Sequence, residues 1–423
     1  MAKMIIEGGH RLSGEIESSG SKNGALAVIA AALLVEDVVV LRNIPHIFDI
    51  YTMLDVLQAI GIHTQLSPDG TLTLDARYIT TSEPPPNLVK KMRGSFSVLG
   101  PLLARTGLAR VGIPGGCDIG SRPIDFHIKG INALGAVVRN DRGIIEASAD
   151  RLLGNRIYLD FPSAGATQQI MTAACFAEGE TVVENAASEP EVVDVANFLN
   201  QCGAKIRGAG TGTVTIEGVK RLRGIDYTII PDRVEIGTFA LAAANTLGDV
   251  FIRTTAPDHC GALIEKMREI GVAIRVDNAG IHVVAKRRLQ ATDIVTMPFP
   301  GFPTDLQQPM GAVLATSEGT SIITEKVYEH RFRYLQELDR MGADARFENR
   351  TAVIRGVPKL IGTAVTACDL RAGAALTIAA LAADGRTEIS DVEHIYRGYS
   401  CFEEKLNSLG AKVYSGEAAA CLD

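Results

Sequence analysis

The chain of 423 residues has no tryptophan, and aromatic residues make up only 5% of it. It also has no long hydrophobic run, because the longest, residues 24–35, ends at Glu36 and is much shorter than the roughly 18 residues of a membrane-spanning helix. The N-terminal residues contain no apolar segment typical of a secretory signal. We therefore expect a protein with no membrane association.

Paired cysteine motifs and an excess of positive charge are missing as well. The seven cysteines form no CxxC pair, which is typical of proteins in a reducing cytoplasm. Lys and Arg number 42 against 49 Asp and Glu, a net charge of −7, whereas proteins that bind nucleic acid usually carry a basic surplus. We expect a cytoplasmic protein without a nucleic-acid partner.

What the chain does have is a composition of 46% hydrophobic and 22% charged residues, with 42 glycines. This composition is typical of a globular protein with a large core, here built from Ala, Val, Leu and Ile with many tight turns. At about 150 residues per domain, the length predicts roughly two to three domains.

One pattern recurs six times: an apolar residue, two further residues, an apolar residue or cysteine, and glycine. The six glycines are Gly61, Gly135, Gly203, Gly271, Gly342 and Gly410, spaced by 74, 68, 68, 71 and 68 residues. Each occurrence predicts the end of an amphipathic helix that a glycine terminates. Six occurrences at nearly one period favour internal repeats over coincidence.

Each repeat also contains an alanine-rich segment that is apolar nearly all round, such as residues 376–383. A helix that is apolar on every side is expected to be buried. The predicted repeat is therefore a buried helix, a strand, an amphipathic helix and two further strands, in about 70 residues. Because so small a piece could hardly be stable alone, we expect the repeats to pack in groups.

The predicted buried helices begin with polar residues, and most of these can simply be caps. Lys22, Arg93 and Arg371 differ, because a cation is disfavoured at a helix N-terminus, and an anion would offset that cost. The loops before the amphipathic helices add Arg122, Arg331 and Arg397. A single such arginine is usually solvated, but the set predicts a cleft for a ligand with several carboxylate or phosphate groups.

Residues 111–123 contain four glycines and two prolines, which predicts an exposed loop of the kind that often carries function. Cys117 lies in this loop five residues before Arg122, a cation that would favour the reactive thiolate. Cys175, Cys202 and Cys260 fall in apolar helical patterns and are interpreted as buried hydrophobic residues. No P-loop, HExxH or Rossmann glycine pattern is present, and no histidine has metal-ligand spacing, so we predict neither a metal site nor a cofactor.

Taken together, these motifs resemble the enolpyruvyl transferases, and among them those that act on UDP-N-acetylglucosamine. The resemblance covers residues 1–413. The cysteine loop is specific, because the sister enolpyruvylshikimate-phosphate synthases share the repeats but lack that loop. The segments that carry the resemblance are Ser21-Lys22-Asn23-Gly24, the cysteine loop from Pro114 to Pro123, Pro303-Thr304-Asp305, Asp369-Leu370-Arg371 and Arg397-Gly398.

The resemblance implies an α/β fold: a two-domain inside-out α/β barrel built from six repeats of about 70 residues, three per domain. One domain would be discontinuous, made of residues 1–20 plus 231–423, and the other would be an inserted domain of residues 21–230. The N-termini of the buried helices would then face a shared cleft.

The implied activity is transfer of the enolpyruvyl group of phosphoenolpyruvate to the 3-hydroxyl of UDP-N-acetylglucosamine, with release of phosphate. The mechanism would be addition followed by elimination, and the reaction is the first committed step of peptidoglycan biosynthesis. The expected partners are these two small molecules.

The resemblance also implies roles for individual residues. Cys117 would be the general acid or assist product release, and Asp305 would be the base, with Lys22 and Arg397 as further catalytic residues. Phosphoenolpyruvate would be bound by Lys22, Arg93, Arg122, Arg331, Arg371 and Arg397. The sugar nucleotide would be bound by Asn23, Arg93, Arg122, Pro123, Ile124, Asp125, His127, Ser163, Ala164, Gly165, Thr304, Asp305 and Val327.

One departure and three alternatives stay open. Some members of the family carry a lysine that contacts the diphosphate just before the serine of the third repeat, where this chain has Phe161 and Pro162. An enzyme of the same family with another acceptor would need neither Cys117 nor the residues around the uridine. A non-catalytic anion-binding scaffold would tolerate loss of Asp305. A cysteine phosphatase is disfavoured, because Cys117 and Arg122 are one residue too close together for its C-x5-R motif.

Overall fold

The computed structural model describes residues 3–115, 120 and 124–416. The chain divides into two compact units. The terminal unit combines residues 3–19 with 231–416, and the inserted unit combines residues 20–115 with 124–230. The chain passes from the first to the second after Ser19 and returns after Ile230.

Five of the six sheets in the described residues share one order of strand pairing. An edge strand runs parallel to a central strand, which pairs antiparallel with a second central strand, and this pairs antiparallel with the other edge strand. The inserted unit contains the sheet of β13 (Asp226–Thr228), β3 (Val38–Arg42), β5 (Leu72–Asp75) and β4 (His63–Leu66), and the sheet of β9 (Arg156–Tyr158), β10 (Glu180–Glu184), β12 (Thr213–Glu217) and β11 (Lys205–Arg207).

The terminal unit contains three sheets of this kind. They are β2 (Ser13–Glu17), β14 (Asp249–Arg253), β16 (Gly280–Val284) and β15 (Ala273–Asp277); β17 (Ile294–Val295), β18 (Thr320–Thr324), β20 (Thr351–Arg355) and β19 (Asp344–Glu348); and β21 (Ala364–Thr366), β22 (Arg386–Ser390), β1 (Lys3–Glu7) and β23 (Lys412–Gly416). The remaining sheet belongs to the inserted unit and has only antiparallel pairs, in the order β6 (Leu108–Gly112), β8 (Ile144–Ser148) and β7 (Val137–Asp141).

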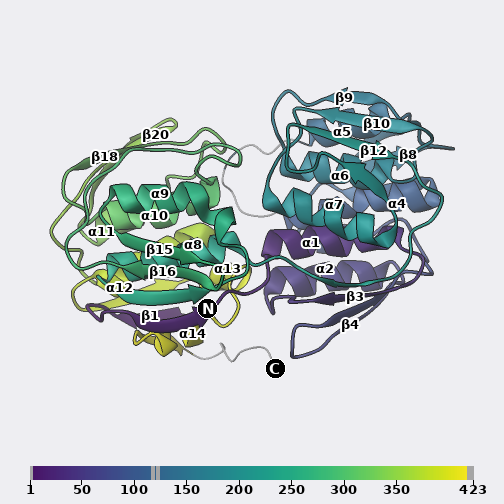
Figure 1. The fold of residues 1–423 in the computed structure, drawn as a ribbon. Helices are drawn as coiled ribbons and strands as arrows, with labels where there is room; N and C mark the ends of the chain where they lie inside the picture. The colour runs from purple at the N-terminus through teal and green to yellow at the C-terminus, as the bar shows by residue number, and fades with distance from the viewer. Residues whose placement is uncertain (1–2, 116–119, 121–123, 417–423) are drawn as a thin grey trace. The chain divides into compact units, whose positions relative to one another are not determined.

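The N-terminal strands complete sheets that are otherwise formed by the C-terminal half of the chain. Strand β1 pairs with both β22 and β23, and Figure 1 shows it in purple beside the yellow C-terminal segments. Strand β2 pairs parallel with β14. Where the chain leaves and re-enters the terminal unit, the backbone N–H of Asp232 donates to the carbonyl of Ser19 at 2.9 Å. The two crossing segments therefore run side by side.

Helices begin where the sequence predicts buried helices. They are α1 (Lys22–Ala31), α4 (Leu99–Thr106), α6 (Ala164–Ala174), α8 (Arg233–Asn245), α10 (Gln307–Leu314) and α12 (Leu370–Ala382). Four of them start after a polar residue whose side chain accepts from a backbone N–H of the first turn, as expected of a cap, namely Ser21, Ser163, Asp232 and Asp369. These predictions are confirmed because capping depends on local sequence.

The second and fifth helices differ from the prediction in their first turns. Each opens as a 3₁₀ turn, η2 (Arg93–Val98) before α4 and η4 (Thr304–Leu306) before α10. Pro101 and Pro309 lie in the first turn of the α-helix that follows. Proline has no N–H to continue the α-helical pattern toward the N-terminus, so it fits a first turn and disfavours an earlier start.

The amphipathic helices end at the glycines that the sequence singles out. They are α2 (Phe48–Ala59), α5 (Asp125–Ala133), α7 (Pro190–Cys202), α9 (Gly261–Glu269), α11 (Tyr334–Arg340) and α14 (Phe402–Ser408). All six glycines that follow have φ between 90° and 108°, a backbone conformation that other residues rarely adopt. The predicted helix ends are confirmed. Four short helices, η1 (Ala32–Leu34), α3 (Pro86–Val89), η3 (Pro257–Cys260) and α13 (Glu393–Tyr396), complete the described elements.

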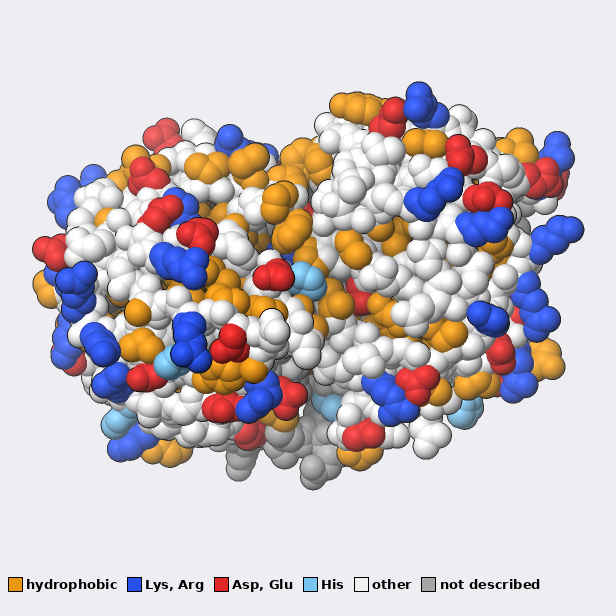
Figure 2. Space-filling model, in the orientation of Figure 1, with side chains coloured by type: hydrophobic (Ala, Val, Ile, Leu, Met, Phe, Trp, Pro, Cys, Tyr) orange, Lys and Arg blue, Asp and Glu red, His pale blue; other side chains and the backbone are white. Residues whose placement is uncertain are grey.

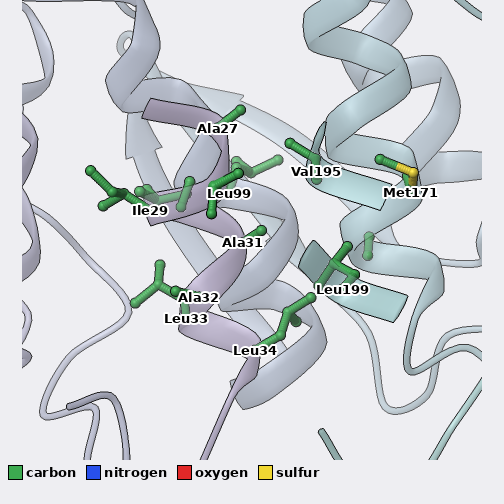
Figure 3. Close-up of a cluster of buried hydrophobic side chains, with 14 of the residues drawn as sticks. Ala27, Ile29, Ala31, Ala32, Leu33, Leu34, Leu99, Met171, Val195 and Leu199 are labelled. Atoms are coloured by element: carbon green, nitrogen blue, oxygen red, sulfur yellow. The ribbon is translucent and has the colours of Figure 1, made fainter. Parts of the chain in front are cut away.

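Each unit has its own core, formed by the helices and the inner faces of its sheets. In the inserted unit, α1, α6 and α7 lie between the sheet of β3 and β4 and that of β9, β10 and β12 (Figure 1). Figure 3 shows alanines of α1, among them Ala27 and Ala31, on the side that faces Val195 and Leu199 of α7, whereas Ile29 points to the opposite side. The many alanines allow the helices to pack closely, so the core is filled without tryptophan.

The surface carries both signs of charge. On the face that Figure 2 shows, lysine and arginine side chains alternate with aspartate and glutamate over each unit, and several form exposed pairs such as Arg42 with Asp226 and Lys129 with Asp160. In the part of the chain that the structure describes, no helix is long and apolar enough to cross a membrane.

From the packing of the core we predict how truncation of a side chain of α1 changes the free energy of unfolding. Ile29 is fully buried, so Ile29→Ala should lower the free energy of unfolding by about 2–5 kcal/mol, through lost burial and the cavity left behind. Denaturant unfolding of the whole chain, followed by circular dichroism, measures this. Val137→Ala is the matched control, because Val137 is 55% exposed, and its effect should stay within about 0.5 kcal/mol. Equal effects of the two changes would contradict this account of the core.

Candidate active site

The starts of the buried helices carry most of the residues predicted for the site. Cys117, Arg122 and Pro123 lie outside the described residues. The others fall into two groups, one in each unit, and each group is described by itself.

In the terminal unit, Asp305 lies in η4 between two arginines that come from distant parts of the sequence. Its Oδ1 is 2.7 Å from Nη2 of Arg331, and its Oδ2 is 3.0 Å from Nη2 of Arg371. Nε of Arg371 also donates to Oδ2 at 3.3 Å. Of these side chains, Asp305 is 24% exposed, whereas Arg331 and Arg371 are only 6% and 5% exposed.

The two arginines determine the charge state of Asp305. Burial alone would raise the pKa of its carboxyl group, but the guanidinium groups of Arg331 and Arg371 outweigh burial and hold that pKa well below its ordinary value. Asp305 is therefore an ionised carboxylate at neutral pH. Asp305 does not cap this helix, because the residue at the N-cap of η4 is Pro303.

Both guanidinium groups are also held by contacts that do not involve the carboxylate. Nη1 of Arg331 donates to the carbonyl of Thr304 at 2.6 Å, and the group lies 5.0 Å from the ring centre of Tyr328. Nη1 of Arg371 donates to the hydroxyl of Tyr399 at 3.1 Å. The buried Nε of Arg331 has no hydrogen-bond partner among the described residues, so one donor of this group stays unused.

A second layer of polar side chains holds these residues in place, and little in the sequence predicts it. Asp369 accepts from the backbone N–H of Arg371 at 2.8 Å and so caps α12. Gln308 donates to Asp369 at 3.0 Å and to the carbonyl of Arg331 at 3.3 Å. The only signal for Gln308 is a pair of glutamines at the start of an otherwise apolar helix.

Glu325 is another residue that sequence reasoning missed. It is fully buried, accepts from the hydroxyl of Thr304 at 2.9 Å and accepts from the N–H of Val327 at 2.7 Å. It thereby brings together two residues predicted to contact the sugar nucleotide. Arg397, half-buried, lies directly after α13.

In the inserted unit, Lys22 begins α1 and meets a carboxylate of the protein. Its Nζ lies 2.7 Å from Oδ2 of Asp49 on α2, and the two side chains are only 10% and 5% exposed. The sequence predicted that an external anion offsets the cost of a cation at this helix start, but here and at Arg371 a carboxylate of the chain itself does so. Asn23 follows Lys22 and is exposed, and Arg93 begins η2 half-buried.

His127 lies at the start of α5 and packs against α6. Its Nδ1 is 2.6 Å from Oε1 of Gln169, and its ring meets that of Phe96 edge to face at 5.4 Å. A Cβ atom added to Gly165 would lie 3.2 Å from Cε1 of His127, so glycine lets the ring approach the helix start. Because an amide oxygen only accepts, Nδ1 carries the hydrogen and Nε2 is left as an acceptor.

Burial lowers the pKa of His127 to about 4, with the nearby Arg93 acting in the same direction and Gln169 opposing it. The ring is therefore neutral at pH 7. Around it lie Ile124 and Asp125, which begin α5, and the start of α6, where Ser163 caps the helix that Ala164 and Gly165 open. Free backbone N–H groups at such a helix start favour anionic ligands.

The two groups offer complementary chemistry. The inserted unit provides a buried ammonium group, a neutral imidazole and a helix N-terminus. The terminal unit provides a carboxylate and two oriented guanidinium groups. Among the described residues, no cluster of three or more histidine, cysteine, aspartate or glutamate side chains could hold a metal ion.

Comparison with known proteins shows which family the chain resembles. The family model described as EPSP synthase (3-phosphoshikimate 1-carboxyvinyltransferase) matches residues 6–406. UDP-N-acetylglucosamine 1-carboxyvinyltransferase 2 of Carboxydothermus hydrogenoformans is 53% identical over 98% of this chain and 99% of its own length. UDP-N-acetylglucosamine 1-carboxyvinyltransferase of Gloeobacter violaceus is 51% identical over 96% of this chain and 89% of its own.

A solved structure shows the same two-domain α/β architecture. The enolpyruvyl transferase NikO from Streptomyces tendae superposes with a TM-score of 0.90 at 28% identity, covering 99% of both chains. The similarity therefore extends over the whole chain.

The environment of His127 predicts its titration. Because its pKa is lowered to about 4, its ring should stay neutral with hydrogen on Nδ1 between pH 5.5 and 8, as long-range ¹H–¹⁵N spectra would show. His127→Gln assigns the resonance by removing it. Below pH 6.5 the unfolded chain binds a proton here that the folded chain does not, so this group lowers stability as the pH falls from 6.5 toward 4. A midpoint near 6.5 would contradict the burial and the Gln169 contact.

Proposed function

This chain belongs to the EPSP synthase family of enolpyruvyl transferases, and we propose that it transfers the enolpyruvyl group of phosphoenolpyruvate to the 3-hydroxyl of UDP-N-acetylglucosamine. Phosphate is released, and the reaction is the first committed step of peptidoglycan biosynthesis. The choice of acceptor is supported by the names of relatives about half identical over nearly the whole chain. The structural observation that carries the proposal is the carboxylate of Asp305 held between two buried guanidinium groups.

The reaction makes three demands on the protein. Addition of the sugar hydroxyl to phosphoenolpyruvate gives a tetrahedral phospho-ketal, from which phosphate is then eliminated. A base must take the proton of the hydroxyl, an acid must protonate the methylene carbon, and cations must bind the phosphate and carboxylate of the substrate. The cations we assign to this task are Lys22, Arg93, Arg122, Arg331, Arg371 and Arg397.

We assign the base to Asp305 and the acid to Cys117. Asp305 suits the role because it is ionised and is more exposed than Arg331 and Arg371. A substrate that approaches from solvent can therefore reach its carboxylate and transfer a proton to it. Cys117 would protonate the methylene carbon or assist product release, and its thiol can also add to the substrate. Lys22 and Arg397 would stabilise the charge that develops on the phosphate.

We assign the sugar nucleotide to the starts of α1, α5 and α6 and to the η4 region. Ser163 occupies the N-cap of α6, and the N–H groups that follow it are suited to a diphosphate. The neutral ring of His127 offers an acceptor nitrogen to a uridine N–H. The full set is Asn23, Arg93, Arg122, Pro123, Ile124, Asp125, His127, Ser163, Ala164, Gly165, Thr304, Asp305 and Val327.

We further propose that the six sheets with their buried helices are six repeats of about 70 residues, three in each domain. The order of strand pairing that five of the six sheets share supports this, as does the position of the helices between outer sheets in Figure 1. Such an arrangement is an inside-out α/β barrel, since the sheets surround the helices. On the grounds of its cysteine pattern and of its substrates, we place the enzyme in the cytoplasm, with no cofactor.

The activity is tested by the release of phosphate from phosphoenolpyruvate. Release should require UDP-N-acetylglucosamine, and Asp305→Ala should slow it by about 10²- to 10⁴-fold, the usual contribution of a general base. Asp293→Asn, in the same unit, is the control and should retain activity, because an asparagine oxygen can still accept from the N–H of Ile322. Near-normal turnover in Asp305→Ala would rule out the role of base, and phosphate release without the sugar nucleotide would rule out the transfer.

The role of Cys117 is tested by alkylation. A phosphonate epoxide such as fosfomycin resembles phosphoenolpyruvate, and a thiolate opens the epoxide to form a thioether while the ring oxygen takes up a proton. Intact-protein mass spectrometry should show one adduct in the wild type and in Cys368→Ser, the control at an exposed thiol, and none in Cys117→Ser. An adduct that persists in Cys117→Ser would show that another thiol reacts.

A further inference from the structure

Asp305 forms ion pairs with two of the cations that we assign to binding of the substrate. One oxygen of its carboxylate is paired with Arg331 and the other with Arg371. A substrate phosphate or carboxylate would seek the same N–H groups, because guanidinium groups bind such planar or tetrahedral anions through paired donors. The carboxylate of the protein and the anion of the substrate are therefore competitors.

The exposure of the three side chains defines how a substrate reaches the arginines. The carboxylate is 24% exposed, while the guanidinium side chains behind it are only 6% and 5% exposed. Solvent thus meets the carboxylate first. An anion that arrives from solvent reaches the guanidinium groups by displacing this carboxylate rather than by binding beside it.

The arginines are prepared for such an exchange. Each keeps another partner, the carbonyl of Thr304 for Arg331 and the hydroxyl of Tyr399 for Arg371, so neither group depends on Asp305 for its orientation. The buried Nε of Arg331 is without a hydrogen-bond partner among the described residues. An incoming oxygen can therefore form a contact that Asp305 does not make.

The exchange would change the basicity of Asp305. While both guanidinium groups face it, they hold the pKa of its carboxyl group well below the ordinary value, and a weak base removes the proton of a hydroxyl poorly. Besides Asp305, the groups that act on the two arginines include Tyr328 and Asp369 at Arg331, and Tyr399 and Asp232 at Arg371. Once the arginines pair with another anion, burial remains, and burial raises the pKa of a carboxyl group.

We propose that phosphoenolpyruvate displaces Asp305 from Arg331 and Arg371, and that this displacement frees the carboxylate to act as the base. The proposal rests on the proposed function and adds regulation to it. Two ion pairs within the protein are exchanged for pairs with the substrate, and the proton of the sugar hydroxyl then passes to the freed carboxylate. The base would thus gain strength only when phosphoenolpyruvate is in place.

Calorimetric titration of the whole enzyme with inorganic phosphate, pyruvate and phosphoenolpyruvate tests the competition. Asp305→Asn keeps the size of the side chain but removes its charge, and it should bind phosphoenolpyruvate about tenfold or more tightly than the wild type, a typical size for coupling between two binding events. Tightening for phosphate alone would identify the phosphate group as the competitor, and tightening for pyruvate alone would identify the carboxylate.

Three matched variants make the result decisive. Asp305→Glu keeps a competing carboxylate and should bind phosphoenolpyruvate within about threefold of the wild type. Asp293→Asn removes one negative charge from the same unit, away from the arginines, and should leave the affinity unchanged. Asp305→Ala replaces Asp305→Asn if the latter fails to fold, as judged by circular dichroism. Unchanged or weaker binding in a folded uncharged variant, or equal tightening in Asp293→Asn, would overturn the proposal.

Failure of this inference can be told apart from failure of the proposed function. Wild-type enzyme that releases phosphate only with UDP-N-acetylglucosamine, but whose Asp305→Asn variant binds phosphoenolpyruvate no more tightly, retains the function and refutes the displacement. Tighter binding in the variant, together with a wild type that releases no phosphate, supports the displacement and refutes the proposed reaction.

Discussion

The rest of the structure depends on how it pairs the cations at the starts of its buried helices. An unpaired buried charge costs several kcal/mol, and for a cation the positive end of a helix adds to that cost. Lys22 meets Asp49 on the neighbouring helix, and Arg371 meets Asp305. Because the partners are carboxylates of the chain itself, these helices can begin with cations inside a folded protein.

Polar contacts beside these ion pairs give the site its preorganisation. Catalysis of a reaction with highly charged intermediates gains most from charges that are already oriented before the substrate arrives. Arg371 is fixed at its backbone by the cap of Asp369 and at its guanidinium group by Tyr399, and Gln308 ties Asp369 to the segment that carries Arg331. The contacts that stabilise the fold are thus the contacts that orient the cations.

The sequence allowed local features to be predicted and left long-range partners open. The six helix ends at Gly61 and its equivalents, and helix caps such as Ser163, depend on the backbone within one turn, so the pattern of residues was enough. The partner of Lys22 could not be predicted, because nothing near Asp49 distinguishes it from the other 48 acidic residues. Only the packing of α2 against α1 brings the two together. The buried position of Glu325 was missed for the same reason.

Two helix starts with a similar sequence, one in each unit, support different chemistry. Gln169 on α6 and Gln308 on α10 occupy similar places, each in a Gln-Gln-x-Met segment. Gln169 accepts from the neutral ring of His127, whereas Gln308 donates to the carboxylate of Asp369. An amide can accept or donate with little change of shape, so the same buried residue satisfies a neutral ring in one unit and an anion in the other. A glutamine at this position therefore lets the neighbouring functional residue differ between the two helices, which a buried charge would not.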